Sequence, residues 1–576
     1  MKPSVTTGSF NSGCWQKLLL MRRHLVSCCL LLAMLGGQHT TWAQAPAWQT
    51  AAAIVGVDEG YSWVNATAAD EQGNVYVAGT FYDKIRLGSI TLQATNKYDH
   101  LAFVAKWEVA TQQFRWGSTL GTVPGFNGIN YVGLAVHNSR VYVTSGASLY
   151  RFTDAGNSGR LDWVQGLPNT TTTAVALNDN NIYVTGSFRG TLALATPLLY
   201  NTSLTGSDIF VAKYRDDGLS PYCVWARSAG GGEDDRATAL AVNGTAIYVA
   251  GTYGSLQAAF GTTVFRNGNP DYSTTDGFVA KLTDTGPAGD FTWAVAASSP
   301  SIDDLVAVAV QGNQVYVAGN MFITSHSPSI TGHFGLVELA YHSRPQLLVA
   351  SLTDEGLTSR MNWVNTDGDW NSVNALAARG TSIYLAGQGD NPGSVGGYPF
   401  SHPASAASYS LTHPSFFVAK LTDAGTAARY NWVQTADQDG AGLAVAVGAG
   451  AAVYVAGVGR GRFGNAIITG QSANVLAQLD DSPNTIKEYP TELAEASLFP
   501  NPAHTAAVLR LPAVPGATQA TIIWYSALGQ VVRTQQASLA FPDTTLDLLL
   551  TGLAAGSYLL RIEAGEQRLT RTLVVQ

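Results

Sequence analysis

One hydrophobic segment that ends in glycine recurs seven times along this chain of 576 residues. Successive terminal glycines lie 67, 40, 65, 68, 68 and 70 residues apart, so one unit is short and the others are nearly equal. A repeat of this length means that one structural unit is stacked many times, which limits the possible folds more than any other feature. The copies read VYVAG, VYVTSG, IYVTG, IYVAG, VYVAG, IYLAG and VYVAG, and they end at Gly79, Gly146, Gly186, Gly251, Gly319, Gly387 and Gly457.

Each copy is accompanied by three other segments in a constant order. A run of small apolar residues precedes it, such as ALAV at 239–242, a segment such as FVAKL at 278–282 follows it, and a tryptophan such as Trp293 comes last. Turn residues separate the segments, including a TDxG sequence before the tryptophan. Alternating apolar and β-branched residues between turns are typical of strands. Four strands repeated seven times predict an all-β fold, a seven-bladed β-propeller over residues 46–481.

The two ends of the repeat region are complementary. Trp48 has no preceding partner segments, and the last FVAKL-type segment, VLAQL at 475–479, has no following tryptophan. We therefore expect the Trp48 segment to be the outer strand of the seventh blade. Such closure removes an open sheet edge, which would otherwise invite aggregation.

The repeat is similar to a known family. GNVYVAG at 73–79 and DGFVAKL at 276–282, followed by a tryptophan, resemble the SBBP repeat of bacterial seven-bladed propellers. The resemblance extends over roughly residues 47–481 and implies the fold. It implies no particular activity, since propellers host both enzymes and binding modules.

A second module follows a linker at 482–496. Residues 497–576 alternate short strands with glycine turns, which predicts a small β-sandwich of the immunoglobulin-like kind. This region resembles the type A C-terminal sorting domain of the type IX secretion system of Bacteroidetes. The resemblance implies export through that translocon, action of its sorting peptidase, and a place outside the cell or on the outer-membrane surface. A stabilising or carbohydrate-binding sandwich is the alternative. The matching residues are Pro500, Asn501, Pro502, Gly529, Gly556 and Tyr558.

Residues 1–45 have the pattern of a secretory signal peptide. Arg22 and Arg23 precede an apolar run at 25–35, and small residues follow at 41–45. We expect cleavage after Ala43, and Met21 is an alternative start of translation. The uncharged stretch at 441–459 is long enough to mimic a membrane span, but it aligns with a strand pair of the repeat. No transmembrane span is therefore expected in the mature chain.

Charge narrows the range of partners. The net charge is −8, and only 12% of residues are charged. A nucleic-acid partner is not expected, because phosphate backbones require a basic face. An unknown extracellular glycan or protein is the expected ligand.

Acidic residues recur in the connections between one tryptophan strand and the next blade. In an a-b-c-d blade these connections and the long inserts between strands b and c emerge on the same face, where loops usually carry function. Carboxylates gathered there could bind calcium or a cationic ligand, whereas the simpler interpretation is that they form turn hydrogen bonds. No other metal or cofactor and no catalytic residue is predicted. The acidic residues are Asp58, Glu59, Glu233, Asp234, Asp235, Asp303, Asp304, Asp367, Asp369, Asp437 and Asp439.

These observations favour a secreted or surface-attached propeller that binds through its loop-rich face without catalysis. The alternative is a secreted polysaccharide hydrolase or lyase with its site at the centre of the ring, and a third possibility is a structural matrix component. An enzyme requires carboxylates, Tyr, His or Arg that converge over the central channel. A binding protein would show exposed aromatic residues in the inserts, and a structural unit would show neither feature.

The sorting assignment can be tested by truncation. Deleting residues 491–576 should trap the protein in the periplasm, because the signal peptide would still act while the second export step would fail. Cell fractionation and surface labelling measure the outcome. Surface display of the truncated chain would contradict the assignment.

Overall fold

In the computed structural model, the described residues are 45–123, 131–203, 205–267, 274–322, 331–339, 345–367, 370–390, 393–400, 414–464, 466–469, 473–482, 496–512, 519–526, 530–539, 543–564 and 567–576. They form two compact units, Met1–Asp481 and Ser482–Gln576. The predicted signal peptide, with Met21 and Ala43, lies outside the described residues. So does most of the predicted linker.

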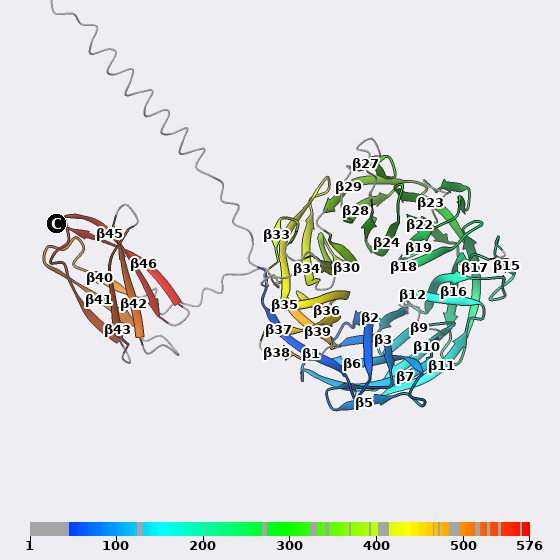
Figure 1. Cartoon of the computed structure of the whole chain (residues 1–576), viewed down its shortest axis with the longest axis horizontal. Helices are drawn as coiled ribbons and strands as arrows, with labels where there is room; N and C mark the ends of the chain where they lie inside the picture. Colours follow the sequence, from blue (N-terminus) through cyan, green and yellow to red (C-terminus); the bar gives the residue numbers. More distant parts are fainter. Residues whose placement is uncertain are drawn as a thin grey trace, which may run out of the picture. The chain divides into compact units, whose positions relative to one another are not determined.

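The larger unit is a β-propeller whose described strands form seven antiparallel blades around a central channel (Figure 1). Each blade runs outward in the predicted order a-b-c-d. The first four blades are β2(Tyr61–Ala69), β3(Val75–Tyr82), β6(His100–Glu108), β7(Gln113–Thr122); β8(Val132–His137), β9(Arg140–Ser145), β10(Ser148–Asp154), β11(Gly159–Gly166); β12(Thr170–Asn178), β13(Asn181–Phe188), β16(Asp208–Asp216), β17(Pro221–Ala229); and β18(Asp235–Asn243), β19(Ala246–Tyr253), β22(Asp276–Asp284), β23(Gly289–Ser298).

The last three blades complete the ring. One long strand, β35, serves two of them: its first half is the outer strand of blade six, and its second half is the inner strand of blade seven. The 441–459 stretch forms the end of β35 and the whole of β36, as expected, and no described helix is long and apolar enough to span a membrane. The strands are β24(Asp303–Gln311), β25(Gln314–Met321), β28(Gln346–Asp354), β29(Ser359–Asp367); β30(Ser372–Arg379), β31(Ser382–Gly389), β34(Ser415–Asp423), β35(Ala428–Val447); and β36(Ala452–Gly459), β39(Asn474–Asp480), β1(Trp48–Gly56).

The ring closes through its two ends, which confirms the prediction. The first strand, β1, pairs antiparallel with β39, and Figure 1 shows them side by side. The register of Trp48 differs from that of the other tryptophans, however. In the other blades the tryptophan lies opposite the fourth residue of the FVAKL segment, as Trp293 does opposite Lys281, whereas here Thr50 lies opposite Gln478. Trp48 instead packs against Phe416 and Phe463.

The inserts between strands b and c fold into small hairpins in six blades. The described hairpin residues do not line the channel, and Figure 1 shows β5, β15, β27 and β33 at the periphery of the ring. Two hairpins pair with the outer strand of a blade, and the other four are separate two-stranded sheets. Strand β4 pairs with β1, the outer strand of the preceding blade, and β26 pairs with β23. Covering edge strands in this way protects them from intermolecular pairing. The hairpins are β4(Lys84–Leu87), β5(Ile90–Gln93); β14(Thr191–Leu192), β15(Leu199–Tyr200); β20(Gln257–Phe260), β21(Thr263–Arg266); β26(Gly332–Phe334), β27(Val337–Leu339); β32(Ser394–Val395), β33(Tyr398–Pro399); and β37(Gly461–Phe463), β38(Ala466–Ile468).

A buried carboxylate joins neighbouring blades, and we call this arrangement the aspartate clamp. Asp284, from the TDxG turn of blade four, accepts hydrogen bonds from three side chains of blade three: Tyr183 (2.6 Å), Lys213 (2.6 Å) and Trp225 (3.1 Å). It also accepts one from the backbone N–H of Gly286 (2.9 Å), whose φ of +96° suits glycine. Each clamp thus joins three strands of one blade to the hairpin of the next.

The clamp recurs at six blade junctions. Asp154, Asp354 and Asp481 each accept hydrogen bonds from a tyrosine, a lysine and a tryptophan at the equivalent positions of the preceding blade. At Asp216 an arginine replaces the lysine and the indole N–H of Trp163 makes no bond to the carboxylate, and at Asp423 the lysine position is a serine. The junction between blade seven and blade one has no such clamp among the described residues, because its outer strand presents Thr50 at the tryptophan position and β39 presents Gln478 at the lysine position.

The charge state of the clamp determines its pH dependence. Burial raises the pKa of Asp284, but hydrogen bonds from Lys213 and Tyr183, among others, outweigh it and hold the pKa below its usual range. A carboxylate with a lowered pKa stabilises the fold above its ordinary pKa and loses that contribution as pH falls through the folded value. The clamp is therefore intact at neutral pH and is lost in acid.

The smaller unit is a two-sheet sandwich, as expected. One sheet has the order β40-β41-β44 and the other β43-β42-β45-β46. Side chains from both sheets form one core, including Leu509 and Leu548 from the first and Trp524 and Leu560 from the second. Its strands are β40(Ser497–Phe499), β41(Ala506–Pro512), β42(Gln519–Tyr525), β43(Val531–Ser538), β44(Asp543–Leu549), β45(Gly556–Ala564) and β46(Gln567–Val575).

Neutralising one clamp should destabilise the propeller. Asp284→Asn leaves the buried Lys213 without a charged partner, which should lower the free energy of unfolding by about 3 kcal/mol at pH 7. Chemical denaturation measures the change. Asp290→Asn is the matched control, because its ion pair with Arg227 is at the surface and should contribute less than about 1 kcal/mol. Equal effects of the two substitutions would contradict the role of the clamp.

Candidate functional site

The inner strands carry a repeated irregularity at the mouth of the channel. In six blades the pairing of strand a with strand b skips one residue of strand a, which is a β-bulge. A bulge redirects the side chain of the extra residue. Here all six extra residues line the same cavity, and we call them the bulge ring: Asn65, Thr173, Thr238, Val306, Asn374 and Leu443.

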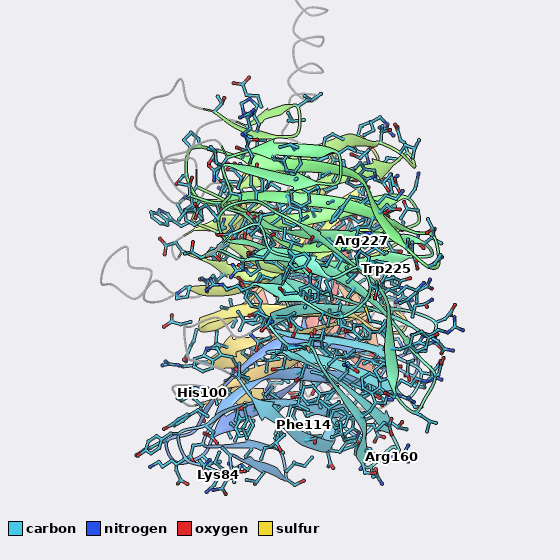
Figure 2. All side chains as sticks on the ribbon, turned by 90° about the vertical axis from the view of Figure 1, so that its right-hand side faces the viewer. Lys84, His100, Phe114, Arg160, Trp225 and Arg227 are labelled. Carbon is cyan, nitrogen blue, oxygen red and sulfur yellow. The ribbon has the colours of Figure 1, made fainter. Side chains whose placement is uncertain are left out.

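The bulge ring forms the floor of a central cavity of about 550 Å³. Below it, three consecutive residues of every inner strand line a narrower channel of about 300 Å³. The cavity wall also includes residues from the connections between blades, such as Tyr131 before β8, and from the inserts between strands b and c, such as Thr275 before β22. Both kinds of connection were predicted to lie on the loop-rich face. The cavity therefore opens on the predicted loop-rich face. Figure 2 shows the ring from the side, with His100 toward one face and Arg160 toward the other.

Arg236 is the one basic residue among the described residues that line the cavity. Its guanidinium carbon lies 5.0 Å from the ring centre of Tyr131, a cation–π contact. Its Nε is buried and donates no hydrogen bond to a described residue. Burial raises the pKa of Tyr131, although the charge of Arg236 opposes this rise, so the phenol remains protonated at neutral pH.

Asp304 is the one acidic residue among the described residues of the cavity wall. Its Oδ1 accepts hydrogen bonds from the backbone N–H and the side-chain amide of Asn320, both at 3.0 Å. Burial raises its pKa, and the bonds from Asn320 and the charge of Arg236 oppose that rise. The carboxyl group is thus held in place close enough to Arg236 to be influenced by its charge.

A row of aromatic rings extends from the cavity across blade one. Trp63 lines the cavity and meets Tyr61 edge-on at 4.7 Å between ring centres. Tyr61 stacks on Tyr82 at 5.0 Å, and His100 lies 5.1 Å from Tyr82. Because these residues are partly exposed and belong to three adjacent strands, they form an aromatic surface that begins inside the cavity.

The acidic residues predicted as a binding surface do not converge. Asp58 and Glu59 pair with Lys84 and Lys97, and Asp234 pairs with Arg189, all as exposed contacts. Other members lie in separate connections around the ring: Glu233 and Asp437 are exposed, Asp367 and Asp439 are partly buried, and Asp369 lies outside the described residues. Of the eleven, Asp304 alone lines the central cavity in the described structure.

Several of these carboxylates accept hydrogen bonds from backbone N–H and hydroxyl groups, within their own turn or from a neighbouring connection. Asp235 accepts from the N–H groups of Gly231 and Ser255 and from the hydroxyl of Ser255. Asp367 accepts from the N–H of Gly396, and Asp437 from that of Arg462. Within the described ranges, no three His, Cys, Asp or Glu side chains gather where they could hold a metal ion. The geometry therefore offers no observation in favour of calcium at these loops.

Two of the predicted residues are buried with strongly shifted pKa values. Burial, with a contribution from nearby Asp276, raises the pKa of Asp303 to about 7. Burial, with a smaller contribution from Asp208, raises the pKa of Asp235 to about 6. Both are fully buried where one blade meets the next. They are structural groups and do not reach the cavity.

Sequence reasoning missed most of the cavity wall, including Trp63, Asn65, Tyr131 and Arg236. A signal for part of it exists: aligned inner strands have polar residues at one position of an otherwise apolar segment, Asn or Thr at 65, 173, 238 and 374. An apolar strand facing only packed neighbours would not need them.

The sorting residues lie at one end of the small unit. Asn501 bonds to two backbone groups of β46, accepting from Val574 and donating to Thr572, and Tyr558 donates to the carbonyl of Ala554. Pro500, Pro502 and Gly556 are described, whereas Gly529 lies outside the described residues. A shallow cavity of about 570 Å³ is lined by Tyr525, Tyr558 and Arg561, among others.

Comparison with known families finds one match. Residues 497–576 match the secretion system C-terminal sorting domain. The protein is therefore secreted through the type IX secretion system to the cell surface or the extracellular space. No curated protein matches the chain at a significant level.

Several solved structures are similar to this chain, among them the following three. Sqt1 of Saccharomyces cerevisiae is 8% identical, with 77% of this chain and 100% of that chain covered and a TM-score of 0.34. Hsv2 of Kluyvelomyces marxianus is 9% identical, with 65% of this chain and 97% of that chain covered and a TM-score of 0.28. The PQQ-bound aldose sugar dehydrogenase of Streptomyces coelicolor is 13% identical, with 62% of this chain and 95% of that chain covered and a TM-score of 0.27.

Removing the buried charge at Asp303 should stabilise the fold in a pH-dependent manner. A raised folded pKa means that ionisation of Asp303 opposes folding increasingly as pH rises from about 4 toward 7. Asp303→Asn keeps the acceptor that bonds Ser299 but cannot ionise. Its free energy of unfolding should exceed that of the wild type by roughly 1–3 kcal/mol at pH 8 and by little at pH 4.

Thermal and chemical denaturation at the two pH values provide the measurement. The exposed Asp58→Asn is the control and should show no such pH-dependent gain. A gain for Asp303→Asn that is the same at both pH values would show that ionisation of Asp303 does not oppose folding.

Proposed function

We propose that this protein is a secreted or surface-attached binding and scaffold protein that recognises an extracellular glycan or protein in its central cavity. The propeller is of the SBBP repeat type, and its activity is binding without catalysis. Residues 46–481 carry this function, a linker at 482–496 follows, and residues 497–576 direct export.

The observation that supports this proposal is the bulge ring. Six blades each direct one extra side chain into the same cavity, and an aromatic surface adjoins it. Polar groups there lack partners: Asn65 Oδ1 and Arg236 Nε are buried and make no hydrogen bond to a described residue. Buried polar atoms without partners are rare in folded proteins, and a bound ligand would satisfy them. The volume lies within the range of about 300–1,000 Å³ common among small-ligand sites.

The charge arrangement supports binding over the alternative, a polysaccharide hydrolase or lyase. Hydrolysis of a glycosidic bond usually needs a pair of carboxyl groups across the bond, and Asp304 stands alone among the described lining residues. Elimination needs a base near the sugar ring, and the raised pKa of Tyr131 makes its phenol a poor one. Tyr131, Arg236 and Asp304 do converge over the channel, as the enzyme alternative requires, but the described lining residues include no second carboxyl group for hydrolysis. Elimination with Asp304 as the base is the form of the alternative that the degradation assay below tests.

Export involves partners of its own. We propose that a signal peptide at 1–45, cleaved after Ala43, first delivers the chain to the periplasm. The translocon of the type IX system and its sorting peptidase then act on the C-terminal module. The match of residues 497–576 to the sorting domain supports this second step.

Filling the cavity should abolish binding. Leu443 is a member of the bulge ring, so Leu443→Trp should occupy the space without adding charge. We expect the secreted full-length protein to bind one component of an immobilised array of extracellular polysaccharides and peptides, and the variant to lose that binding. The matched control, Leu357→Trp, changes an exposed residue in a c–d turn at the opposite face and should bind as the wild type does.

Two outcomes would contradict the proposal. Binding that survives Leu443→Trp while the variant unfolds at the same temperature as the wild type would place the site elsewhere. Release of soluble fragments, or of an unsaturated sugar seen by ultraviolet absorbance, from a bound polysaccharide would show that the protein is an enzyme.

A further inference from the structure

We infer that the central cavity binds a carbohydrate residue that carries a carboxylate, as in a uronic acid, with Arg236 receiving the carboxylate. This inference rests on the proposed binding function and adds the class of ligand. Four observations support it: the state of Arg236, the position of Asp304, the unpartnered oxygen of Asn65, and the aromatic surface on blade one.

Arg236 requires an anion. Its contacts among the described residues are the ring of Tyr131 and the electrostatic influence of Asp304, and its buried Nε makes no hydrogen bond. A partly buried guanidinium with an unpartnered buried N–H is unusual, since buried charges are normally paired. Its planar set of N–H donors matches the two oxygens of a carboxylate. A ligand carboxylate would therefore complete the site.

Asp304 and Asn65 supply hydrogen-bond acceptors, in contrast to the donors of Arg236. Oδ1 of Asp304 is occupied by Asn320, which leaves Oδ2 as an acceptor beside the cavity. Oδ1 of Asn65, on the bulge ring, is a second acceptor without a described donor. Both acceptors suit hydroxyl groups, because a hydroxyl can donate to them and still accept from a neighbouring threonine. A sugar ring presents several hydroxyls beside its carboxylate.

The aromatic surface extends this match. Trp63 forms part of the cavity wall, and Tyr61 and Tyr82 continue from it toward the rim. The apolar C–H face of a sugar packs on aromatic rings, which have a large apolar surface and a polar edge. The row of rings gives room for further units of a chain whose end enters the cavity. An oligosaccharide therefore fits the surface better than a single carboxylic acid does.

An acidic peptide satisfies fewer of these groups. Its carboxylate would engage Arg236, but its side chain would bring no hydroxyls to Asp304 or Asn65. Only single backbone N–H donors, spaced along the peptide, would be left for these two acceptors, whereas a sugar ring offers several adjacent hydroxyls. The geometry thus favours an acidic sugar, and a peptide becomes an outcome of the test.

The test compares two trisaccharides and one peptide. Isothermal titration of the secreted full-length protein should detect binding of trigalacturonate, weaker binding of maltotriose, which lacks carboxylates, and no binding of a triglutamate peptide. Arg236→Met retains the apolar stem and removes the donors, so it should weaken trigalacturonate binding about tenfold or more while changing maltotriose binding little. Arg236→Lys keeps the charge, so its affinity for trigalacturonate should lie between that of the wild type and that of Arg236→Met.

Arg227→Met is the matched control. Arg227 lies on β17, an outer strand, and bonds to the carbonyl of Ala226 and weakly to Asp290. This variant should bind both trisaccharides as the wild type does. Thermal unfolding of every variant in the same buffer separates loss of binding from loss of folding, since the cavity residues are not part of the aspartate clamps.

The failures of the two proposals differ. If the triglutamate peptide or a neutral sugar binds as well as trigalacturonate and Leu443→Trp abolishes that binding, the cavity is the site but the carboxylated-sugar inference is wrong. If trigalacturonate binds equally to the wild type and to a folded Arg236→Met, Arg236 is not the carboxylate receptor. If Leu443→Trp leaves every interaction intact, the proposed function itself fails.

Discussion

The aspartate clamp is the interaction on which the rest of the propeller depends. A blade is held to its neighbour by few covalent constraints, and apolar packing alone would allow adjacent sheets to slide. A buried carboxylate that bonds a tyrosine, a lysine and a tryptophan from three different strands removes that freedom, because directional bonds fix all three strands at once. A buried charge pair adds little net stability compared with apolar contact, but a misaligned one is strongly unfavourable. The clamp therefore determines how neighbouring blades align.

Alignment of the blades has a direct consequence at the centre of the ring. The six bulges occur at equivalent positions, so their extra residues meet at one level of the channel. The clamp residues are nearly constant from blade to blade, whereas the bulge residues vary from Asn and Thr to Val and Leu. The outer part of each blade thus preserves the architecture while the inner position sets the chemistry of the cavity. This division allows the ligand to change without altering the packing between blades.

The sequence motifs were sufficient to predict the architecture and insufficient to predict the site. Alternation and repetition identify strands, their order and the closing strand, because these depend on local pattern. The role of Asp284 could not be read in the same way, since its donors Tyr183 and Lys213 lie some seventy residues or more earlier and meet it only after folding. The bulge at Asn65 could not be predicted from the sequence pattern either. One skipped pairing between the strands changes which side chain faces the channel. The acidic loops were conspicuous for the opposite reason: turns favour Asp whether or not a ligand is present.

The closing strand also bears on the time course of folding. Hydrogen bonds between Val64 and Asn474 and between Asn474 and Ser62 join residues more than 400 positions apart. Contacts of such long sequence separation form late, because the intervening chain must first become compact. The first strand, β1, and the last, β39, therefore pair only after the intervening blades have become compact. Closure of the ring is thus a consequence of the folding of the blades between these two strands.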